Sequence, residues 1–458
     1  MFIYDSLVGK KIEFKPIVPN EVKLYVCGQT VYDDCHIGHA RSMIVFDMVV
    51  RYFKSKNFKV TLVRNITDVE DKIIQRAHEN KESCDALTAR YIESMHRDEA
   101  ALHVLSPDVE PRATAFIEPI TVLIKKLIAN DVAYVANNGD VYFSVKKFDA
   151  YGKLSKRDID KLISGARVEI NDAKKDPLDF VLWKLSKPHE PQWDSPWGKG
   201  RPGWHIECSA MASHILGQPF DIHGGGMDLK FPHHENEIAQ SEAAEHKTFA
   251  NVWMHVGLLN VNDEKMSKSL KNFFTIQEVL AKYSPEIIRY FMLSAHYRSP
   301  VNYDKNNIAL AEQALTRLYT ALRGLPITDS NIDNIFSEKL NAAMNDDFNS
   351  PVAMAVLFDI AREINRLRAE NNVKQAAILG GQLKSLGALF GILQMDPDIF
   401  LKGDQDDAFS QTVTDLITKR NAARQAKNWA EADRVRDALA GMGVVIEDSA
   451  GNTTWRRA

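Results

Sequence analysis

The first 80 residues alternate twice between a short apolar run and a longer amphipathic stretch. Residues 22–27 (VKLYVC) and 59–67 (KVTLVRNIT) predict buried strands, and residues 36–53 and 68–80 predict helices. Strands that alternate with helices form a parallel sheet, which binds ligands beyond the carboxyl ends of its strands. The sequence therefore predicts an α/β fold whose ligand-binding edge holds a set of polar side chains from separate parts of the chain. This set consists of Cys27, His36, His39 and Thr67.

The chain of 458 residues is too long for one ordinary domain. The sheet pattern resumes at residues 219–226 and 251–261, after an irregular stretch rich in Pro, Gly and Trp. Beyond about residue 305 apolar residues recur every three or four positions, as in residues 352–367, which predicts helices. We expect a Rossmann-like parallel-sheet domain with an insertion, then an all-α bundle and a small C-terminal helical and hairpin domain. The expected boundaries are 1–130 and 204–304 for the split α/β domain, 131–203 for the insertion, 305–394 for the bundle, 395–408 for a linker and 409–458 for the C-terminal domain.

Residues 204–237 concentrate side chains that bind metal ions. The stretch contains Cys208, and it contains His233 and Glu237 on a helix that Pro232 is suited to begin. His233 and Glu237 are four residues apart and share one face of that helix. A thiolate, an imidazole and a carboxylate together suit zinc. A fourth ligand must come from elsewhere, and Cys27 at the end of its strand is the preferred candidate.

The cysteines and the charge limit the class of protein. Four cysteines in so long a chain are no disulfide framework, and they suit a reducing cytosol. Cys35 competes with Cys27 as a ligand but is more simply a small buried residue, and Cys84 has no partner motif. The chain starts without the apolar core of a signal peptide and has no run of ~20 apolar residues, so we expect a cytoplasmic protein with no membrane contact. A net charge of −4 predicts no general polyanion binder, so a nucleic-acid partner would need local basic patches.

Two short motifs suit a nucleotide triphosphate. His36-Ile37-Gly38-His39 opens a predicted helix, whose free N–H groups attract phosphate, and Gly38 lets a flat base approach the backbone. Lys265 and Lys268, in the Lys-Met-Ser-Lys-Ser run of a polar loop, can neutralise negative charge that rises during reaction. Ordinary surface histidines or a solvated basic loop would explain either motif alone. Both motifs in this order, in one α/β chain, are far more specific than either.

Together these motifs resemble the class I aminoacyl-tRNA synthetases. Further segments are similar to the cysteinyl-tRNA synthetase family: YVCGQTVYDDCHIGHAR, NITDVEDK, GWHIECSAM, HGGGMD and FPHHENEIAQ. The resemblance spans about Tyr25 to Ala458 and is densest before residue 305. Glu70 stands where the family more often has aspartate, which exchanges one carboxylate for another.

The resemblance implies roles for particular residues. It implies one zinc ion per chain, held by Cys27, Cys208, His233 and Glu237. It implies an amino-acid pocket at Thr67, Trp204 and His223, although packing in the core is an alternative role for Trp204. It implies His36, His39, Lys265 and Lys268 as catalytic residues, and Gly38, Gly224, Gly225, Gly226, Asp228 and Lys268 as the ATP site, with Mg²⁺ accompanying the ATP.

The activity implied is the joining of L-cysteine to tRNA(Cys) through cysteinyl-adenylate, with ATP, by a monomer. A pocket that selects its substrate by shape alone would favour cysteine over serine by only ~100-fold. We therefore expect zinc to take the substrate thiolate as an extra ligand, without an editing domain. The helical half is expected to bind the tRNA. Its candidates for RNA contact are Arg420, Arg424 and Lys427 on one helix face, and Trp455, Arg456 and Arg457 near the C-terminus.

Two other functions remain open from the sequence. A ligase that joins cysteine to a small amine would explain residues 1–300 equally well, but it would not explain the long helical half. A non-catalytic relative that binds tRNA or zinc would have no need of both phosphate motifs.

Overall fold

The computed structural model divides the chain into two compact units. It describes all residues except 158–172, 266–271, 328–333, 404–406, 450–451 and 458. One unit comprises residues 1–308, 338–354 and 389–391, and the other comprises residues 309–337, 355–388 and 392–458. The predicted bundle, residues 305–394, is thus shared between the units, and the predicted domain boundaries stay a prediction.

A four-stranded parallel sheet organises the first unit, in the strand order β10-β9-β3-β4. Its strands are β3 (Glu21–Thr30), β4 (Lys59–Thr67), β9 (Phe220–Gly226) and β10 (Ala250–Val256). β4 is buried on both faces over most of its length, whereas β3 is fully buried only at Val22 and at residues 24–26. The predicted α/β fold with a parallel sheet is confirmed.

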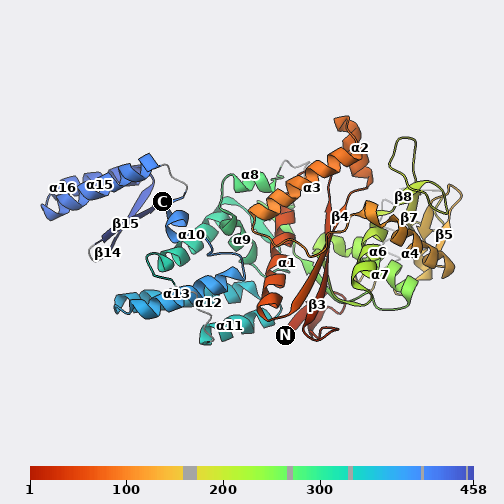
Figure 1. Cartoon of the computed structure of the whole chain (residues 1–458), viewed down its shortest axis with the longest axis horizontal. Helices are drawn as coiled ribbons and strands as arrows, with labels where there is room; N and C mark the ends of the chain where they lie inside the picture. Colours follow the sequence, from red (N-terminus) through yellow and green to blue (C-terminus); the bar gives the residue numbers. More distant parts are fainter. Residues whose placement is uncertain (158–172, 266–271, 328–333, 404–406, 450–451, 458) are drawn as a thin grey trace. The chain divides into compact units, whose positions relative to one another are not determined.

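Helices lie on both sides of this sheet. In Figure 1, α1 (Ile37–Ser55) lies on one side of β3 and β4, and α6 (Trp204–Leu216) and α7 (His233–Glu245) lie on the other. Helix α1 packs so closely on β9 that a Cβ atom at Gly224 would lie 2.3 Å from the ring of Phe46. On the other side, Tyr25, Cys208 and Trp253 share one apolar cluster. The sheet edge that carries the candidate ligands is therefore held between two packed layers.

The remaining helices of the first 308 residues follow the predicted pattern. They are α2 (Asp71–Asn80), α3 (Cys84–Ala101), α4 (Ile117–Ala129), α8 (Ile276–Leu280) and α9 (Pro285–Leu293), with the short 3₁₀ turns η1 (Ala113–Phe116), η2 (Val145–Lys147) and η3 (Met227–Lys230). A non-helical stretch that contains Pro107 separates α3 from η1. Proline favours an extended backbone in the residue before it.

The predicted insertion contains a second sheet that the sequence indicated only in part. Four antiparallel strands follow one another as β5 (Ala133–Val135), β6 (Val141–Phe143), β7 (Phe180–Leu185) and β8 (Gly200–Pro202). Three of the four strands span just three residues, which is too short for a clear periodic signal in the sequence. Phe143 and Trp183 bury this sheet against Ile206 of α6. The insertion is therefore anchored on a helix of the parallel-sheet domain.

Two small sheets complete the first unit. β1 (Phe2–Asp5) pairs with β2 (Lys10–Glu13), and β11 (Leu259–Val261) lies between β12 (Glu264–Lys265) and β13 (Val301–Tyr303). The run 251–261, predicted as one stretch, is divided at Gly257. A Cβ atom there would lie 2.4 Å from the carbonyl oxygen of Ser299, so the close backbone approach requires glycine.

The helical half matches the predicted periodicity. Its elements are α10 (Lys305–Leu322), α11 (Ile335–Asn345), α12 (Ser350–Ala369), α13 (Val373–Ala388), α14 (Pro397–Lys402), α15 (Asp407–Gln425), α16 (Trp429–Gly441), β14 (Val444–Ser449) and β15 (Asn452–Arg457). On α12, Val356, Ile360 and Ile364 are buried as predicted, but Val352 is 52% exposed. The predicted linker contains the short helix α14. The C-terminal hairpin is present, and residues 450–451 of its turn lie outside the described residues.

Candidate metal and nucleotide site

Four predicted metal ligands meet at the carboxyl edge of the sheet. Their ligand atoms all lie within 4.8 Å of one another in the group Cys27, Cys208, His233 and Glu237. The two Sγ atoms are 3.8 Å apart, and Oε1 of Glu237 lies 3.3 Å from Sγ of Cys27 and 3.1 Å from Nε2 of His233. Cys208, His233 and Glu237 are at most 2% exposed. The structure thus brings together side chains from β3, α6 and α7.

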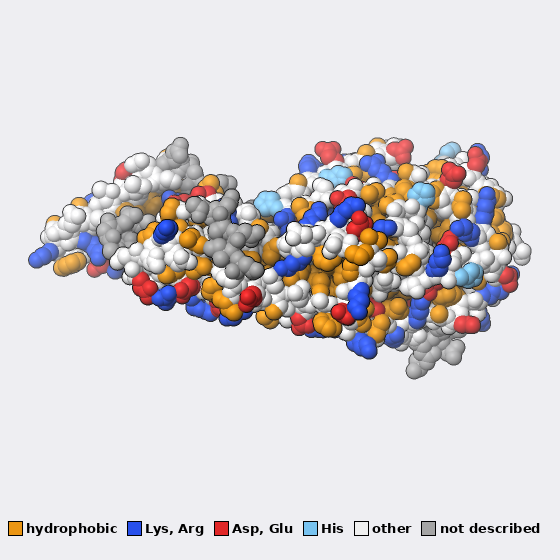
Figure 2. Space-filling model, turned by 60° about the horizontal axis from the view of Figure 1, so that its bottom comes forward, with side chains coloured by type: hydrophobic (Ala, Val, Ile, Leu, Met, Phe, Trp, Pro, Cys, Tyr) orange, Lys and Arg blue, Asp and Glu red, His pale blue; other side chains and the backbone are white. Residues whose placement is uncertain are grey.

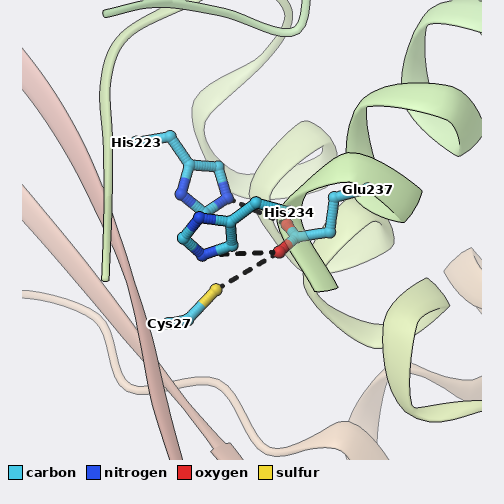
Figure 3. A group of neighbouring side chains, drawn as sticks. All are labelled: Cys27, His223, His234 and Glu237. Atoms are coloured by element: carbon cyan, nitrogen blue, oxygen red, sulfur yellow. Dashed lines mark hydrogen bonds and ion pairs between the residues drawn. The ribbon is translucent and has the colours of Figure 1, made fainter. Parts of the chain in front are cut away.

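A second group of possible ligands shares two of these residues. Figure 3 shows Cys27, His223 and His234 around Glu237, with dashed lines from the carboxylate to each of them. Nε2 of His223 lies 2.9 Å from Oε2 of Glu237, and Nε2 of His234 lies 4.0 Å from Oε1. These atoms also fall within the 4.8 Å limit. The sequence prediction did not include His234 as a ligand.

The electrostatics of the first group suit a bound cation. Burial raises the pKa of Cys27 well above its usual value. Burial also acts to raise the pKa of Cys208, but hydrogen bonds from Cys27 and His233 outweigh it and lower the pKa to about 6. For Glu237 burial is again opposed, by His223 and His233, and its pKa lies well below the usual value. A buried carboxylate and a thiol inclined to ionise are the donors that a divalent cation requires.

His233 carries the charge that a metal ion would replace. Burial lowers its pKa, but Glu237 and Cys208 prevail and raise it to about 10, so a proton here compensates the anions. The set of two sulfurs, one nitrogen and one carboxylate oxygen fits a borderline-soft ion such as zinc. The residues present therefore fit a metal site.

Histidines outside the ligand set orient the ligands, and they were not predicted from the sequence. Nδ1 of His205 lies 2.9 Å from Nδ1 of His233, which leaves Nε2 of His233 to face the cluster. Nδ1 of His234 lies 2.8 Å from Nε2 of His255, whose Nδ1 in turn lies 2.8 Å from the hydroxyl of Ser6. The Nδ1 contact of His234 likewise leaves its Nε2 facing Glu237, so the second sulfur, which suits zinc, is what favours the group with Cys208 and His233. His255 lies within a strand and carries no motif, so only the structure reveals it.

The predicted amino-acid pocket borders the ligand cluster. Trp204 is 37% exposed, and its ring centroid lies 4.4 Å from that of His233, so it is not a residue of the core. The ring of His223 stacks on Trp253 at 4.4 Å. The Thr67 hydroxyl donates a 2.9 Å hydrogen bond to Glu207. All three predicted pocket residues therefore lie near the candidate metal ligands or are linked to their neighbours.

An amide connects the pocket to the ligands. Oδ1 of Asn65 lies 2.8 Å from the backbone nitrogen of Gly28 and 3.5 Å from Sγ of Cys208, and its Nδ2 lies 3.4 Å from the hydroxyl of Thr67. Neither Asn65 nor Glu207 was predicted. Asn65 lies in the segment NITDVEDK and Glu207 lies in GWHIECSAM. Their place within these family-like segments is the one sequence signal that could have identified them.

The first phosphate motif forms the start of α1. His36 is the N-cap, and its Nδ1 accepts a 3.3 Å hydrogen bond from the backbone N–H of His39. The backbone N–H of His36 in turn donates to Nδ1 of His39 at 3.2 Å, and the two rings stack at 3.5 Å. This reciprocal cap fixes both imidazoles at the positive end of α1.

The second motif lies largely outside the described residues. Lys265 ends β12, where it pairs with Asn260, and Lys268 belongs to the undescribed segment 266–271. The chain just after this segment returns to the start of α1. The N–H of Ile37 donates to the carbonyl of Phe274 at 3.0 Å, and the N–H of Ile276 donates to the carbonyl of Cys35 at 2.9 Å. Main-chain hydrogen bonds thus join the start of α1 to Phe274 and Ile276, which follow the undescribed segment in the chain.

The predicted glycines of the ATP site are explained by protein packing. A Cβ atom at Gly225 would lie 2.8 Å from the ring of His234, and one at Gly226 would lie 2.4 Å from the carboxylate of Asp228. Gly224 is confined by Phe46 in the same way. We expected these glycines to admit adenosine, but the neighbouring side chains already require them. Asp228 lies in η3, immediately beyond β9.

The C-terminal candidates for RNA contact need correction. Trp455 is only 6% exposed and belongs to the small core of its domain, so it offers no stacking surface. Arg420 is 8% exposed and is paired with both carboxylate oxygens of Asp448, at 2.9 and 2.7 Å. Trp429, which the sequence analysis passed over, is 60% exposed at the start of α16. A single tryptophan beside Asn428 and Ala430 has no periodic signal that separates an exposed ring from a buried one.

No helix within the described parts of the chain is both long and apolar enough to cross a membrane.

Known proteins are similar to this chain over its whole length. The family model "tRNA synthetases class I (C) catalytic domain" matches residues 13–313, the DALR domain matches residues 339–394, and "Cysteinyl-tRNA ligase anticodon binding domain" matches residues 406–456. The cysteine–tRNA ligase of Coxiella burnetii (strain Dugway 5J108-111) is 58% identical over 457 residues, which cover 100% of both chains. That of Methylococcus capsulatus is 57% identical over 463 residues, covering 99% of each.

Solved structures are similar in fold at much lower identity. Mycobacterium tuberculosis methionyl-tRNA synthetase in complex with methionyl-adenylate has a TM-score of 0.56 and 14% identity, over 81% of this chain and 89% of that one. The Agrobacterium radiobacter LeuRS in its ternary complex with tRNA and LeuAMS has a TM-score of 0.55 and 11% identity, over 84% of this chain and 87% of that one. At these identities the likeness concerns the fold alone, and it agrees with the observed parallel sheet.

Proposed function

The chain belongs to the cysteine–tRNA ligase family of class I aminoacyl-tRNA synthetases, and from this membership we propose how its own residues carry out the reaction. The substrates are L-cysteine, ATP and tRNA(Cys). The cysteine carboxylate attacks the α-phosphate of ATP to give cysteinyl-adenylate and pyrophosphate. The acyl group then passes to the 3′-terminal ribose of the tRNA. The observation that carries this proposal is the cluster of two thiols, an imidazole and a carboxylate at the carboxyl edge of the parallel sheet.

We propose that Cys27, Cys208, His233 and Glu237 hold one zinc ion, which supplies a soft Lewis acid that prefers a thiolate to a hydroxyl. Support comes from the close grouping of the four ligand atoms and from the depressed pKa values of Cys208 and Glu237. His205 orients the ligand His233 through its Nδ1 contact. Thr67, Trp204 and His223 border the place where the substrate side chain would reach the cluster.

We assign the phosphates to the two motifs, of which the first forms the start of α1. His36 and His39 point their fixed rings from a helix N-terminus, where anions bind favourably. Lys265 and Lys268 stabilise the charge that develops at the α-phosphate, and Mg²⁺ accompanies the ATP. Gly38 and the strand end at Gly224, Gly225 and Gly226 border the adenosine, and Asp228 accepts hydrogen bonds from ribose hydroxyls. Catalysis of this step depends on positioning and charge rather than on covalent chemistry by side chains.

The anticodon end of the tRNA is assigned to residues 406–456. Trp429 replaces Trp455 as the proposed stacking surface, because it is exposed and Trp455 is buried. Arg424 contributes charge nearby, at 44% side-chain exposure. On the face of the molecule drawn in Figure 2, positive and negative side chains are interspersed. The distribution of charged side chains therefore does not indicate where RNA would lie on that face.

The protein is proposed to act as a monomer in the cytoplasm, where tRNA charging takes place. All four of its cysteines are free of disulfide bonds, which suits a reducing compartment.

One experiment distinguishes this function from a ligase that joins cysteine to a small amine. Cysteine-dependent exchange of pyrophosphate into ATP is measured first, and transfer to a tRNA(Cys) transcript or to free amines is measured second. We expect exchange and tRNA charging, with both strongly reduced in Lys268→Ala. Transfer to amines without tRNA charging would instead establish the rival activity. Exchange at the wild-type rate in Lys268→Ala would refute the role of this lysine.

A further inference from the structure

Tyr25 is a buried residue next to the ligand cluster to which the reaction assigns no role. It lies on β3 two residues before Cys27, so both side chains project from the same face of the strand. Its side chain is 0% exposed. Its ring lies 5.3 Å from that of His223 and 6.4 Å from that of Phe220, measured between centroids. The ring is therefore held firmly, and its hydroxyl is directed by packing.

The hydroxyl group of Tyr25 has no hydrogen-bond partner among the described residues. A buried polar group left in this state costs about 1–3 kcal/mol. Tyr25 shares an apolar cluster with Cys208, and Cys27, two residues further along β3, packs against the same cluster. The groups around this unpartnered donor thus include two of the candidate metal ligands.

Metal binding changes which hydrogen bonds these neighbouring groups can accept. A metal ligand thiol must lose its proton, so Cys208 becomes a thiolate with free lone pairs. With Cys27 and Glu237 also anionic, the ligands carry three negative charges against two on a divalent ion. In a buried site such excess charge needs hydrogen-bond donors. Glu237 has such a donor in His223, whose Nε2 lies 2.9 Å from Oε2 of Glu237.

We propose that the Tyr25 hydroxyl donates a hydrogen bond to the Cys208 thiolate of the metal-loaded site, which makes Tyr25 a positioning residue that tunes this ligand. The inference rests on the metal site of the proposed function. Such a bond draws electron density from the sulfur, so the ion keeps more of its acidity for an incoming thiolate. It also gives the buried phenol the partner that it lacks.

The test uses the full-length protein loaded with Co²⁺, whose charge-transfer absorption reports on its thiolate ligands. Tyr25→Phe keeps the ring and removes only the donor. We expect the thiolate-to-cobalt band to move to lower energy, because the sulfur lone pairs rise in energy. We also expect the affinity for Co²⁺ and Zn²⁺, measured by chelator competition, to fall by about 10-fold. A 3-fluorotyrosine placed at position 25 is a stronger donor and should move the band to higher energy.

Tyr52→Phe is the matched control. Tyr52 is equally buried at 0% exposure, and its hydroxyl lies 3.0 Å from Oδ1 of Asn345, away from the cluster. We expect a loss of thermal stability in this variant but an unchanged cobalt spectrum. A spectrum and metal affinity of Tyr25→Phe identical to those of the wild type would overturn the inference. A wild-type protein without any thiolate-to-cobalt band would instead refute the proposed metal site, so the two failures are distinguishable.

Discussion

Sγ of Cys27 lies 3.8 Å from Sγ of Cys208, although 181 positions separate the two residues in the chain. No disulfide joins them, and Glu237 and His233 complete the group. Parallel strands end at one edge of a sheet, and a helix packed on that sheet brings its own thiol to the same edge. This arrangement gives a chain without a disulfide framework a place where two sulfurs can face one ion.

Removing one of the two sulfurs should abolish metal binding. Cys208→Ser replaces a soft ligand with a neutral hydroxyl that resists deprotonation, so we expect its loss of zinc affinity to exceed the ~10–100-fold typical of outer-shell changes. The zinc content of the purified protein measures this directly. Cys35→Ser is the control, because Cys35 is also buried, at 4% exposure, but belongs to neither ligand group. Equal zinc in both variants would contradict the assignment of Cys208.

The two overlapping ligand groups make opposite predictions for the adjacent histidines. If Cys208 and His233 are the ligands, His233→Asn should lose zinc, whereas His234→Asn should retain about one equivalent. Nε2 of His233 lies 3.1 Å from Oε1 of Glu237, whereas Nε2 of His234 lies 4.0 Å from it, and this difference supports the prediction. Metal analysis of both variants after dialysis decides between the groups. Retention of zinc in His233→Asn and its loss in His234→Asn would establish the group drawn in Figure 3.

The pH dependence of stability should change in Asp98→Asn. Burial is the largest cause that raises the pKa of Asp98 from 3.8 to about 6, against a hydrogen bond with Gln277. Between these two pH values the folded chain holds a proton that the unfolded chain has released. This carboxyl group therefore destabilises the fold increasingly as the pH rises from about 4 to 6, and fully above that range.

We expect Asp98→Asn to raise the free energy of unfolding by about 1–3 kcal/mol at pH 7.5 and to change it little at pH 4. Urea denaturation at both pH values measures the difference. Glu93→Gln, at an exposed position on the same helix α3, is the control and should have no such pH dependence. A gain at pH 4 equal to the gain at pH 7.5 would contradict the role of titration.

Replacing Trp429 by alanine should weaken tRNA binding, whereas replacing Trp455 by alanine should disrupt folding. Trp429→Ala removes an exposed ring, so we expect tRNA charging to weaken by the ~1–3 kcal/mol of one stacked base while cysteine activation stays unchanged. Trp455→Ala empties part of a core and should unfold the C-terminal domain. Measurements of KM for tRNA and of thermal unfolding separate the two effects. Unchanged KM for tRNA in Trp429→Ala would remove this residue from the proposed interface.

Much of the fold could be predicted because its signals are local. The apolar runs at residues 22–27 and 59–67 and the helix beginning after His36 follow from spacing alone, and the structure contains them. The zinc-type residues could be named from their chemistry and family resemblance, and the structure brings them together. Trp455 was misjudged, because burial depends on which elements pack around a residue rather than on its neighbours in sequence.

Other features depend on contacts that the sequence does not show. His255 reaches His234 only because β10 lies beside β9 in the sheet. The need for glycine at position 224 also has a packing cause, because a Cβ atom there would lie 2.3 Å from the ring of Phe46. In the insertion, β5 and β8 span only three residues each and lack the length that makes periodicity visible. Long-range packing, rather than residue type, decides each of these cases.

The most direct test of the central claim, that a zinc ion on these ligands selects the substrate by its sulfur, compares amino-acid activation with and without metal. Pyrophosphate exchange into ATP is measured with cysteine and with serine, on zinc-loaded protein and on protein stripped by a chelator. We expect the loaded protein to prefer cysteine by far more than the ~100-fold available to shape alone, and the stripped protein to lose cysteine activation. Selective activation of cysteine over serine by the metal-free protein would contradict the account.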